Sequence, residues 1–207
     1  MQIDEILEAF KYLDGTYKRE HVDAAIQYKE KIIPYLIQIL SDLRANPTPY
    51  VEDEDRFEHI YALMLLGHFR VEDAHNVIVD VFSMSEEIVS AVFEDMITED
   101  LPGILLRICD GSLTRIHELL LSRSAYDFCR WAAATALVYA VIDGMANREA
   151  VLEFFSTLFT GQEAEADSAF WDGLASSIYH LYPEELMGAI DSKTTGLYWE
   201  PLWLKGL

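Results

Sequence analysis

The sequence predicts an all-α protein, an α-solenoid of stacked antiparallel helix pairs with no β-sheet. Three observations predict this fold. Apolar residues recur with the helical period of about 3.6 residues along nearly every segment, and strict alternation is almost absent. The segments between the helical patterns are short, which favours antiparallel neighbours. Two segments also share one pattern, in which an acid and an arginine precede small residues paired with leucine.

The expected helices follow one another with short turns between them. They span approximately residues 4–13, 19–28, 31–44, 53–67, 71–82, 83–96, 98–109, 113–121, 126–142, 148–159, 167–181 and 183–190. Glycines 15, 111, 144 and 161 are expected to end helices, because glycine adopts the left-handed backbone of a helix C-terminus.

Three helix starts carry specific signals. Pro34 is expected in the first turn of its helix, where no amide donor is needed. Ser83 and Glu86 have the spacing of a capping box. Thr98 is expected to cap the next helix, with Glu99 and Asp100 in its first turn, where carboxylates complement the helix dipole.

The chain is expected to form one domain, residues 1–207. Its parts are N-terminal helices over 1–46, a proline-rich break at 47–52, stacked pairs over 53–190 and an aromatic C-terminal tail at 191–207. Repetition of helix pairs at intervals of about 40 residues is typical of solenoids.

One segment resembles the core of a HEAT-type repeat. Residues 127–137 read DFCRWAAATAL, and the typical first helix of that repeat has an Asp, an apolar residue, an Arg, spaced alanines and a terminal Ala-Leu. The segment from Asp55 matches in part, since Arg56 precedes its apolar residue instead of following it. The resemblance implies a HEAT-like helical scaffold.

Most of residues 20–160 also resembles a bacterial family of uncharacterised proteins, the domain-of-unknown-function family 1186. The resemblance rests on three stretches: residues 21–40, residues 94–99 with Asp110-Gly111 behind them, and the helix of Arg130. Where that family has a glycine before the aspartate, this chain has Glu94. Some members carry a Cys/His metal-binding tail, whereas this chain ends in Lys205-Gly206-Leu207. The resemblance implies no reaction.

The net charge is strongly negative and unevenly distributed. The chain has 36 acidic residues against 15 Lys and Arg, a formal net charge of −21. Such a balance argues against nucleic acid and anionic membrane as partners, since both require a cationic surface. Residues 51–100 hold fourteen of the acids and only Arg56 and Arg70. In a stack this segment forms one acidic patch, which predicts a partner of basic character.

The chain is expected to be cytoplasmic. Its N-terminus lacks the positive and then apolar pattern of a signal peptide, and its longest uncharged apolar run, residues 131–142, is too short to span a bilayer. Cys109 and Cys129 have no metal-like spacing and are expected as free, buried thiols.

The acidic segment Glu94–Asp100 is the candidate site for chemistry. Its carboxylates Asp95, Glu99 and Asp100, together with Asp110, suit a divalent cation or a polar ligand, because hard cations prefer oxygen. Helix capping is the alternative interpretation.

Established catalytic motifs are absent, so no catalytic residue, metal or cofactor is expected. His117-Glu118 begins a zinc motif, but Leu121 stands where the second histidine should be. The histidines are expected as separate surface or capping residues. Nucleotide-binding glycine loops and nucleophile motifs are missing as well.

The C-terminal segment 196–204 is rich in aromatic residues, with Tyr198, Trp199 and Trp203. It is expected either to cover the open end of the stack or to form a homodimer or partner contact.

The sequence as a whole predicts a non-catalytic scaffold that binds a protein or peptide of basic character. Its expected contacts are the acids Glu52, Asp53, Glu54 and Asp55 and the aromatic tail residues. A metal-dependent enzyme or cation-binding protein that uses Glu94–Asp100 is the alternative.

Overall fold

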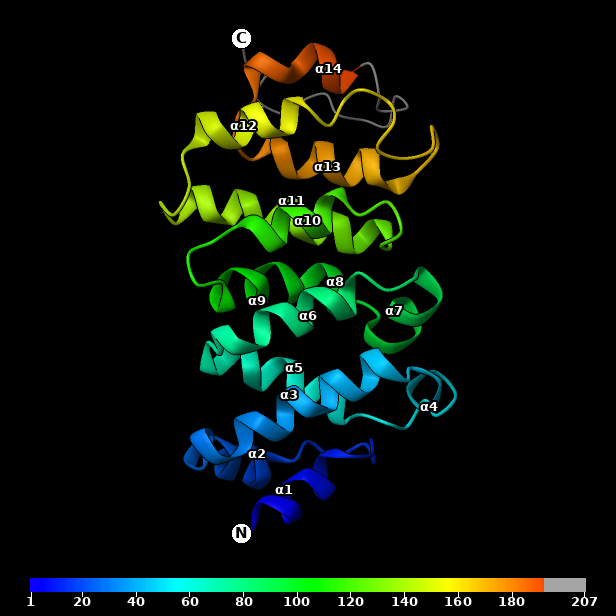
Figure 1. Ribbon diagram of the computed structural model, residues 1–207, viewed down its shortest axis with the longest axis vertical. Coiled ribbons are helices and arrows are strands. Elements are labelled where there is room, and N and C mark those ends of the chain that lie inside the picture. The colour runs from blue at the N-terminus through cyan, green and yellow to red at the C-terminus, as the bar shows by residue number, and fades with distance from the viewer. Residues whose placement is uncertain (192–207) are drawn as a thin grey trace.

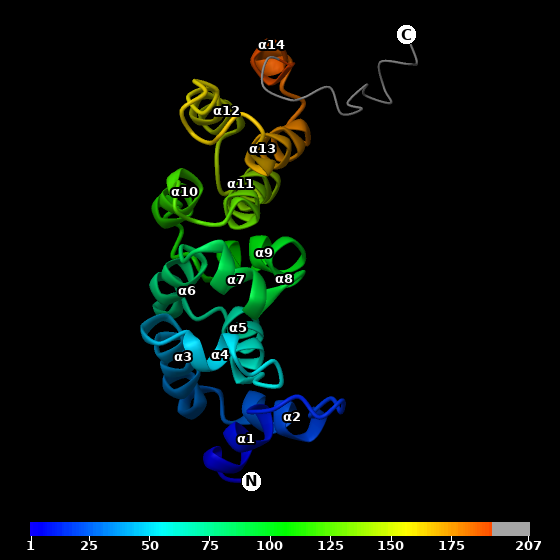
Figure 2. The ribbon, with the colours of Figure 1, turned by 90° about the vertical axis from the view of Figure 1, so that its right-hand side faces the viewer.

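The computed structural model describes residues 1–191, and the helices of this part lie in two layers (Figure 2). The first layer contains α3 (Lys29–Ala45), α6 (His75–Phe82), α10 (Thr114–Leu121) and α12 (Arg148–Ser156). The second contains α5 (Glu58–Phe69), α9 (Leu101–Ile108), α11 (Asp127–Ile142) and α13 (Ala169–Tyr179). Packing of α3 on α5, α6 on α9 and α10 on α11 joins the layers in antiparallel pairs (Figure 1). The predicted all-α helical repeat fold is confirmed.

Shorter elements connect and extend the pairs. At the first end lie α1 (Ile3–Phe10) and α2 (Arg19–Gln27), and α14 (Met187–Asp191) lies at the opposite end (Figure 1). The four-residue α4 (Thr48–Val51) precedes α5. Between α6 and α9 the chain forms α7 (Glu86–Phe93) and α8 (Met96–Glu99), and α8 packs against α9 and α11. Two 3₁₀ turns, Glu72–Ala74 and Glu184–Leu186, complete the elements of the described part.

Small residues bring the helices of the second layer close together. Ala62, Ala133 and Ala136 are fully buried, as the shared sequence pattern predicted. A methyl group placed on Gly67 would stand 2.9 Å from Ile104 Cγ1, and one on Gly173 would stand 2.7 Å from Trp131 Cγ. Helices α5 and α9, and α11 and α13, therefore touch where one of them has no side chain.

Arg130 joins three elements and is 2% exposed. Its Nε donates to the carbonyl of Leu120 in α10 at 3.0 Å, and its Nη2 donates to the carbonyl of Glu163, before α13, at 2.9 Å. Its guanidinium also contacts Asp127 and stacks 3.7 Å from the ring centre of Phe170. The Asp and Arg of the HEAT-like segment thus bind successive helix pairs together.

The loop after α1 is tied to the loop before α5. Leu13 N donates to the carbonyl of Asp55 at 2.7 Å, and Phe57 N donates to the carbonyl of Lys11 at 2.8 Å. These bonds flank an isolated antiparallel bridge between Tyr12 and Arg56.

Several helix boundaries differ from the predictions. Because α3 begins at Lys29, Pro34 lies inside the helix and not in its first turn. The proline-rich break contains the short helix α4, and α5 begins at Glu58 and not at residue 53.

The two predicted cap residues are wrong. Ser83 ends α6, where its hydroxyl donates to the carbonyl of Val79, and Ser85 occupies the N-cap position of α7. Thr98 lies within α8 and donates to the carbonyl of Asp95, so Asp100 precedes α9 instead. Serine and threonine bond readily to a carbonyl of the preceding turn, which competes with capping.

Other expectations are confirmed in full or in part. Glycines 15, 111, 144 and 161 have the expected positive φ angles. Gly144 directly follows the C-cap of α11, whereas Gly15 and Gly161 lie in the loops after α1 and α12 and do not end these helices. Cys109 and Cys129 are buried free thiols. Among residues 1–191, no helix combines the length and apolar character needed to cross a bilayer.

Candidate functional site: an acidic edge and its cavities

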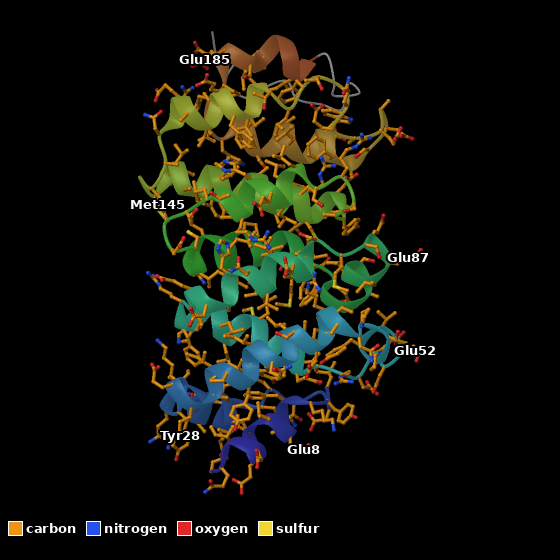
Figure 3. The ribbon with its side chains drawn as sticks, in the orientation of Figure 1. Glu8, Tyr28, Glu52, Glu87, Met145 and Glu185 are labelled. Atoms are coloured by element: carbon orange, nitrogen blue, oxygen red, sulfur yellow. The ribbon has the colours of Figure 1, made fainter. Side chains whose placement is uncertain are left out.

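Carboxylates collect along one edge of the two-layer stack. The helices of the second layer run parallel, so their N-termini lie at the same edge (Figure 1). The packing of α4 on α7 brings the loop at 52–55 beside the ends of α7, and Figure 3 shows Glu52 and Glu87 on this edge, opposite Met145. We call this region the acidic edge; its exposed members are Glu52, Asp53, Glu54, Asp55, Glu86, Glu87, Glu94, Asp95 and Glu99.

Helix dipoles account for part of this distribution. The N-terminus of a helix carries a partial positive charge, and carboxylates there are stabilising by roughly 0.3–1 kcal/mol each. Glu58 and Asp127 occupy such first turns in α5 and α11. The exposed acids of the loops 52–55 and 94–95 lie before the helices, so they add negative charge that the helix dipoles do not explain.

A cavity of about 300 Å³ opens at the acidic edge between α5 and α8. Four carboxylate residues line it, together with apolar residues from three segments. The carboxylate residues are Glu54, Glu94, Asp95 and Glu99, and the apolar walls include Leu13, Phe57, Ile60 and Met96. We call it the acidic cavity. Two parts of the sequence predicted as separate sites meet here.

Arg56 is the cation in the wall of the acidic cavity. Its Nε lies 2.7 Å from Glu58 Oε1, and its guanidinium stacks 3.9 Å from the ring centre of Tyr50. Burial opposes the charged form, but the hydrogen bond and charge of Glu58 exceed it and raise the pKa of Arg56. The arginine is thus largely neutralised by a buried partner, and the cavity keeps its negative character.

His59 lies at the back of the acidic cavity and is 3% exposed. Its Nε2 donates to the carbonyl of Val92 at 3.0 Å, which leaves a lone pair on Nδ1. The rings of Tyr50, Phe57 and Phe93 contact the imidazole edge-on. Burial lowers the pKa of His59 to about 4, so the ring is neutral at pH 7. Nδ1 is enclosed and has no hydrogen-bond partner.

Glu94 bends the chain into the acidic cavity. Its φ of 45° and ψ of −128° lie close to the first central position of a type II′ turn, which glycine normally occupies. A residue with a Cβ in such a conformation costs about 1–3 kcal/mol. The chain therefore keeps a glycine-type turn at the position where the resembling family has glycine.

Two more cavities continue from the acidic cavity along the second layer. A middle cavity of about 230 Å³ shares Glu94 and Asp95 with it and reaches Tyr126 and Phe128 at the start of α11. An apolar cavity of about 260 Å³ shares Thr98 with the middle one and lies between α11 and α13. The three cavities form a row across α5, α8, α11 and α13, in which each shares lining residues with the next, and we call this row the groove.

The other predicted site residues do not join the acidic cavity. Asp100 is half-buried before α9, and Asp110 lies past the other end of that helix, where it accepts a hydrogen bond from Ser112 N. Glu52, Asp53 and Asp55 are exposed on the loop before α5. Tyr198, Trp199 and Trp203 lie outside the described residues. In the described part, no group of three or more His, Cys, Asp or Glu side chains could hold a metal ion.

Sequence reasoning missed the buried histidines. The histidines were predicted as surface or capping residues, but His59 and His75 are only 3% and 7% exposed. His75 is the C-cap of the turn Glu72–Ala74, whereas His59 lies within α5. His59 falls on the inner stripe of its helix with Ala62, Leu63 and Leu66, and this spacing was the available signal.

The comparisons with known proteins agree on one family. Residues 1–197 match the family described as "Protein of unknown function (DUF1186)". The chain belongs to the DUF1186 family. This confirms the family that the sequence resembles.

Two bacterial relatives resemble this DUF1186 chain over most of its length. A protein of Chlamydia trachomatis serovar D, described as "Uncharacterized protein", is 34% identical over 186 residues, which cover 90% of this chain and 74% of the relative. A protein of Chlamydia muridarum with the same description has the same identity and coverage. No solved structure matches the chain.

Proposed function

We propose that this DUF1186 protein is a non-catalytic, cytoplasmic interaction scaffold that binds a protein or peptide partner through basic side chains. One observation carries the proposal: the acidic cavity combines four carboxylate residues with apolar walls. A lysine or arginine side chain has the same two parts, a long apolar stem and a cationic end.

The charges around the cavity support a cationic ligand. Arg56 is the one Lys or Arg of the described part that lines the cavity, and it is paired with Glu58, so it does not neutralise the four rim carboxylates. Exposed carboxylates beside the cavity would steer a basic partner toward it and speed its association at low salt. A further contact through Tyr198, Trp199 and Trp203, including a homodimer contact, stays a prediction from the sequence.

The test compares two triple variants with the same change in net charge. The first, Glu54→Lys with Glu94→Lys and Glu99→Lys, changes the acidic cavity. The control, Glu8→Lys with Glu20→Lys and Glu30→Lys, changes exposed acids at the N-terminal end. The probe is fluorescein-labelled hexalysine, and the measurement is fluorescence anisotropy at low and moderate salt.

We expect the wild-type protein to bind the probe and to lose affinity as salt rises, because screening weakens exposed charge pairs. The cavity variant should bind at least tenfold more weakly than the control variant. Equal losses in the two variants would show that only net charge matters and would contradict the proposal.

A further inference from the structure

We infer that the partner of the acidic edge is an extended peptide that lies along the groove, with its basic residues in the acidic cavity and an apolar residue in the apolar cavity. This inference rests on the proposed function and adds the form and the pattern of the ligand. Its basis is the adjacency of the three cavities, since each shares lining residues with the next.

The two ends of the groove differ in chemistry. The acidic cavity is lined by four carboxylate residues, whereas no Asp, Glu, Lys or Arg among residues 1–191 lines the apolar cavity. Its walls are Trp131, Ala132, Val138, Tyr139 and Ile142, with hydroxyl residues and His180 beside them. A ligand that satisfies both ends must be cationic at one end and apolar at the other.

The apolar cavity is lined in part by exposed apolar side chains that a ligand could bury. Ile142 is 65% exposed and Tyr139 is 42% exposed, although both belong to a largely buried helix. The nearby Thr135 hydroxyl donates to the Ser177 hydroxyl at 2.9 Å, and Ser177 donates to the carbonyl of Gly173 at 3.0 Å, so an apolar group can enter without leaving these donors unpaired. Burial of apolar surface here would stabilise the complex in proportion to its area.

The spacing follows from helix packing. The acidic cavity lies between α5 and α8, and the apolar cavity lies between α11 and α13. Packed helix axes are about 8–10 Å apart, so two helix spacings separate the cavities by at least roughly 16–20 Å. An extended chain rises about 3.3–3.6 Å per residue. The basic and apolar residues of the peptide should therefore be at least about five or six positions apart.

The test uses fluorescein-labelled ten-residue peptides of one composition on the full chain. In the spaced peptide a Lys-Arg pair and a leucine are about six positions apart, with serine and glycine between them. In the compact peptide they are adjacent, and in a third peptide serine replaces the leucine. Each peptide is made in both chain directions, and affinity is read by fluorescence anisotropy.

We expect the spaced peptide, in one direction, to bind at least tenfold more tightly than the compact peptide. Ile142→Glu should lower the affinity for the spaced peptide about tenfold and leave the affinity for the serine peptide unchanged. The matched control is Leu121→Glu, which changes an exposed apolar residue of α10, in the other layer; it should affect neither peptide.

The results separate this inference from the proposed function. One outcome is that Glu94→Lys with Glu99→Lys lowers the affinity of every peptide while peptide spacing and Ile142→Glu have no effect on affinity. In that case the proposed function stands and the groove inference is wrong. If Glu94→Lys with Glu99→Lys changes nothing, both fail. A tenfold gain for the spaced peptide in the Trp199→Ser, Trp203→Ser variant would identify the chain's own C-terminal segment as the occupant and overturn the inference.

Discussion

The imidazole of His59 couples protonation to folding. The ring lies among three aromatic side chains, and its burial there favours the neutral form although the hydrogen bond to the Val92 carbonyl favours the charged one. Burial lowers its pKa from 6.5 to about 4 in the folded protein. Between these two pH values the imidazole is protonated in the unfolded chain and neutral in the folded protein. The free energy of unfolding therefore decreases as pH falls from about 6.5 toward 4.

We expect the free energy of unfolding of the wild type to fall by about 2 kcal/mol between pH 7.5 and pH 5 through this residue alone. His59→Gln keeps an N–H donor for Val92 without the titration, so its fall over the same range should be smaller by that amount. Urea unfolding at both pH values measures this difference. The exposed control His68→Gln should behave as the wild type, and a wild-type pH dependence in His59→Gln would contradict the burial effect.

Individual residues were predicted best where one physical property decides their place. Cys109 and Cys129 are buried because free thiols behave as small apolar groups. His59 was predicted as a surface or capping residue because a polar ring is usually hydrated. Its burial is tolerated because the backbone carbonyl of Val92 accepts the hydrogen bond of the ring. That acceptor is 33 residues away and has no local signal.

At the scale of elements, the contact between α11 and α13 depends on Gly173. Gly173→Ala would place a methyl group 2.7 Å from Trp131 Cγ, so the helices must separate or the indole must move. Overpacking of this kind costs about 1–3 kcal/mol. We expect a lower midpoint in urea unfolding.

Gly103→Ala is the matched control, because a methyl group there would meet nothing within 4 Å and the residue lies inside α9. It should stabilise the protein by up to about 1 kcal/mol through helix propensity. Destabilisation of similar size in both variants would contradict the close-contact explanation.

The turn between α7 and α8 gives a second prediction at this scale. Glu94→Gly removes the strain of the positive φ, and although glycine has a greater entropy cost, the net stabilisation should be about 1 kcal/mol. Thermal unfolding compares it with Glu94→Ala, which removes the carboxylate but keeps the Cβ. If alanine stabilises as much as glycine, charge and not backbone strain is the cause.

The long helices were predictable because their apolar periodicity extends over several turns, as in α11 and α3. Their boundaries were not, since several Ser, Thr and Asp residues near 83–100 compete for the same cap positions. The four-residue helices α4 and α8 are too short to produce a period, and their positions depend on tertiary contacts with α7, α9 and α11.

At the scale of the molecule, Arg130 couples successive helix pairs. Without it, the pairs beside it should open independently of the N-terminal pairs. Arg130→Met removes the donor to the carbonyls of Leu120 and Glu163 and the cation beside Asp127, which keeps the hydrogen bond from Ser168. A buried acceptor left without its donor costs about 1–3 kcal/mol. Hydrogen exchange should rise in α10 to α13 and stay unchanged in α3 and α5, because repeat arrays transmit contacts only to neighbours.

The control Arg123→Met changes an exposed arginine in the same connection and should leave exchange unchanged. A uniform rise along the whole chain would show that the stack unfolds as one unit and would contradict local coupling.

The candidate site was only half predictable. The charge count located an acidic segment, and Glu54 and Glu99 belonged to the two predicted acidic groups. Their meeting in one cavity depends on the packing of α4 on α7 and on the position of α8, which sequence periodicity does not encode. The apolar cavity could not be predicted for the same reason. Its walls come from α11 and α13, and corresponding helices of successive pairs are about 40 residues apart in the sequence.

The placement of α1 and α14 at opposite ends of the stack has a mechanical consequence. A force applied between these ends would pass through each interface between pairs in series, so the pairs would detach one after another at modest load. Insertion of one more pair would lengthen the reach of the molecule by about 10 Å, the thickness of a packed helix layer, and leave the other interfaces as they are. The length of such a stack is set by the number of its repeats.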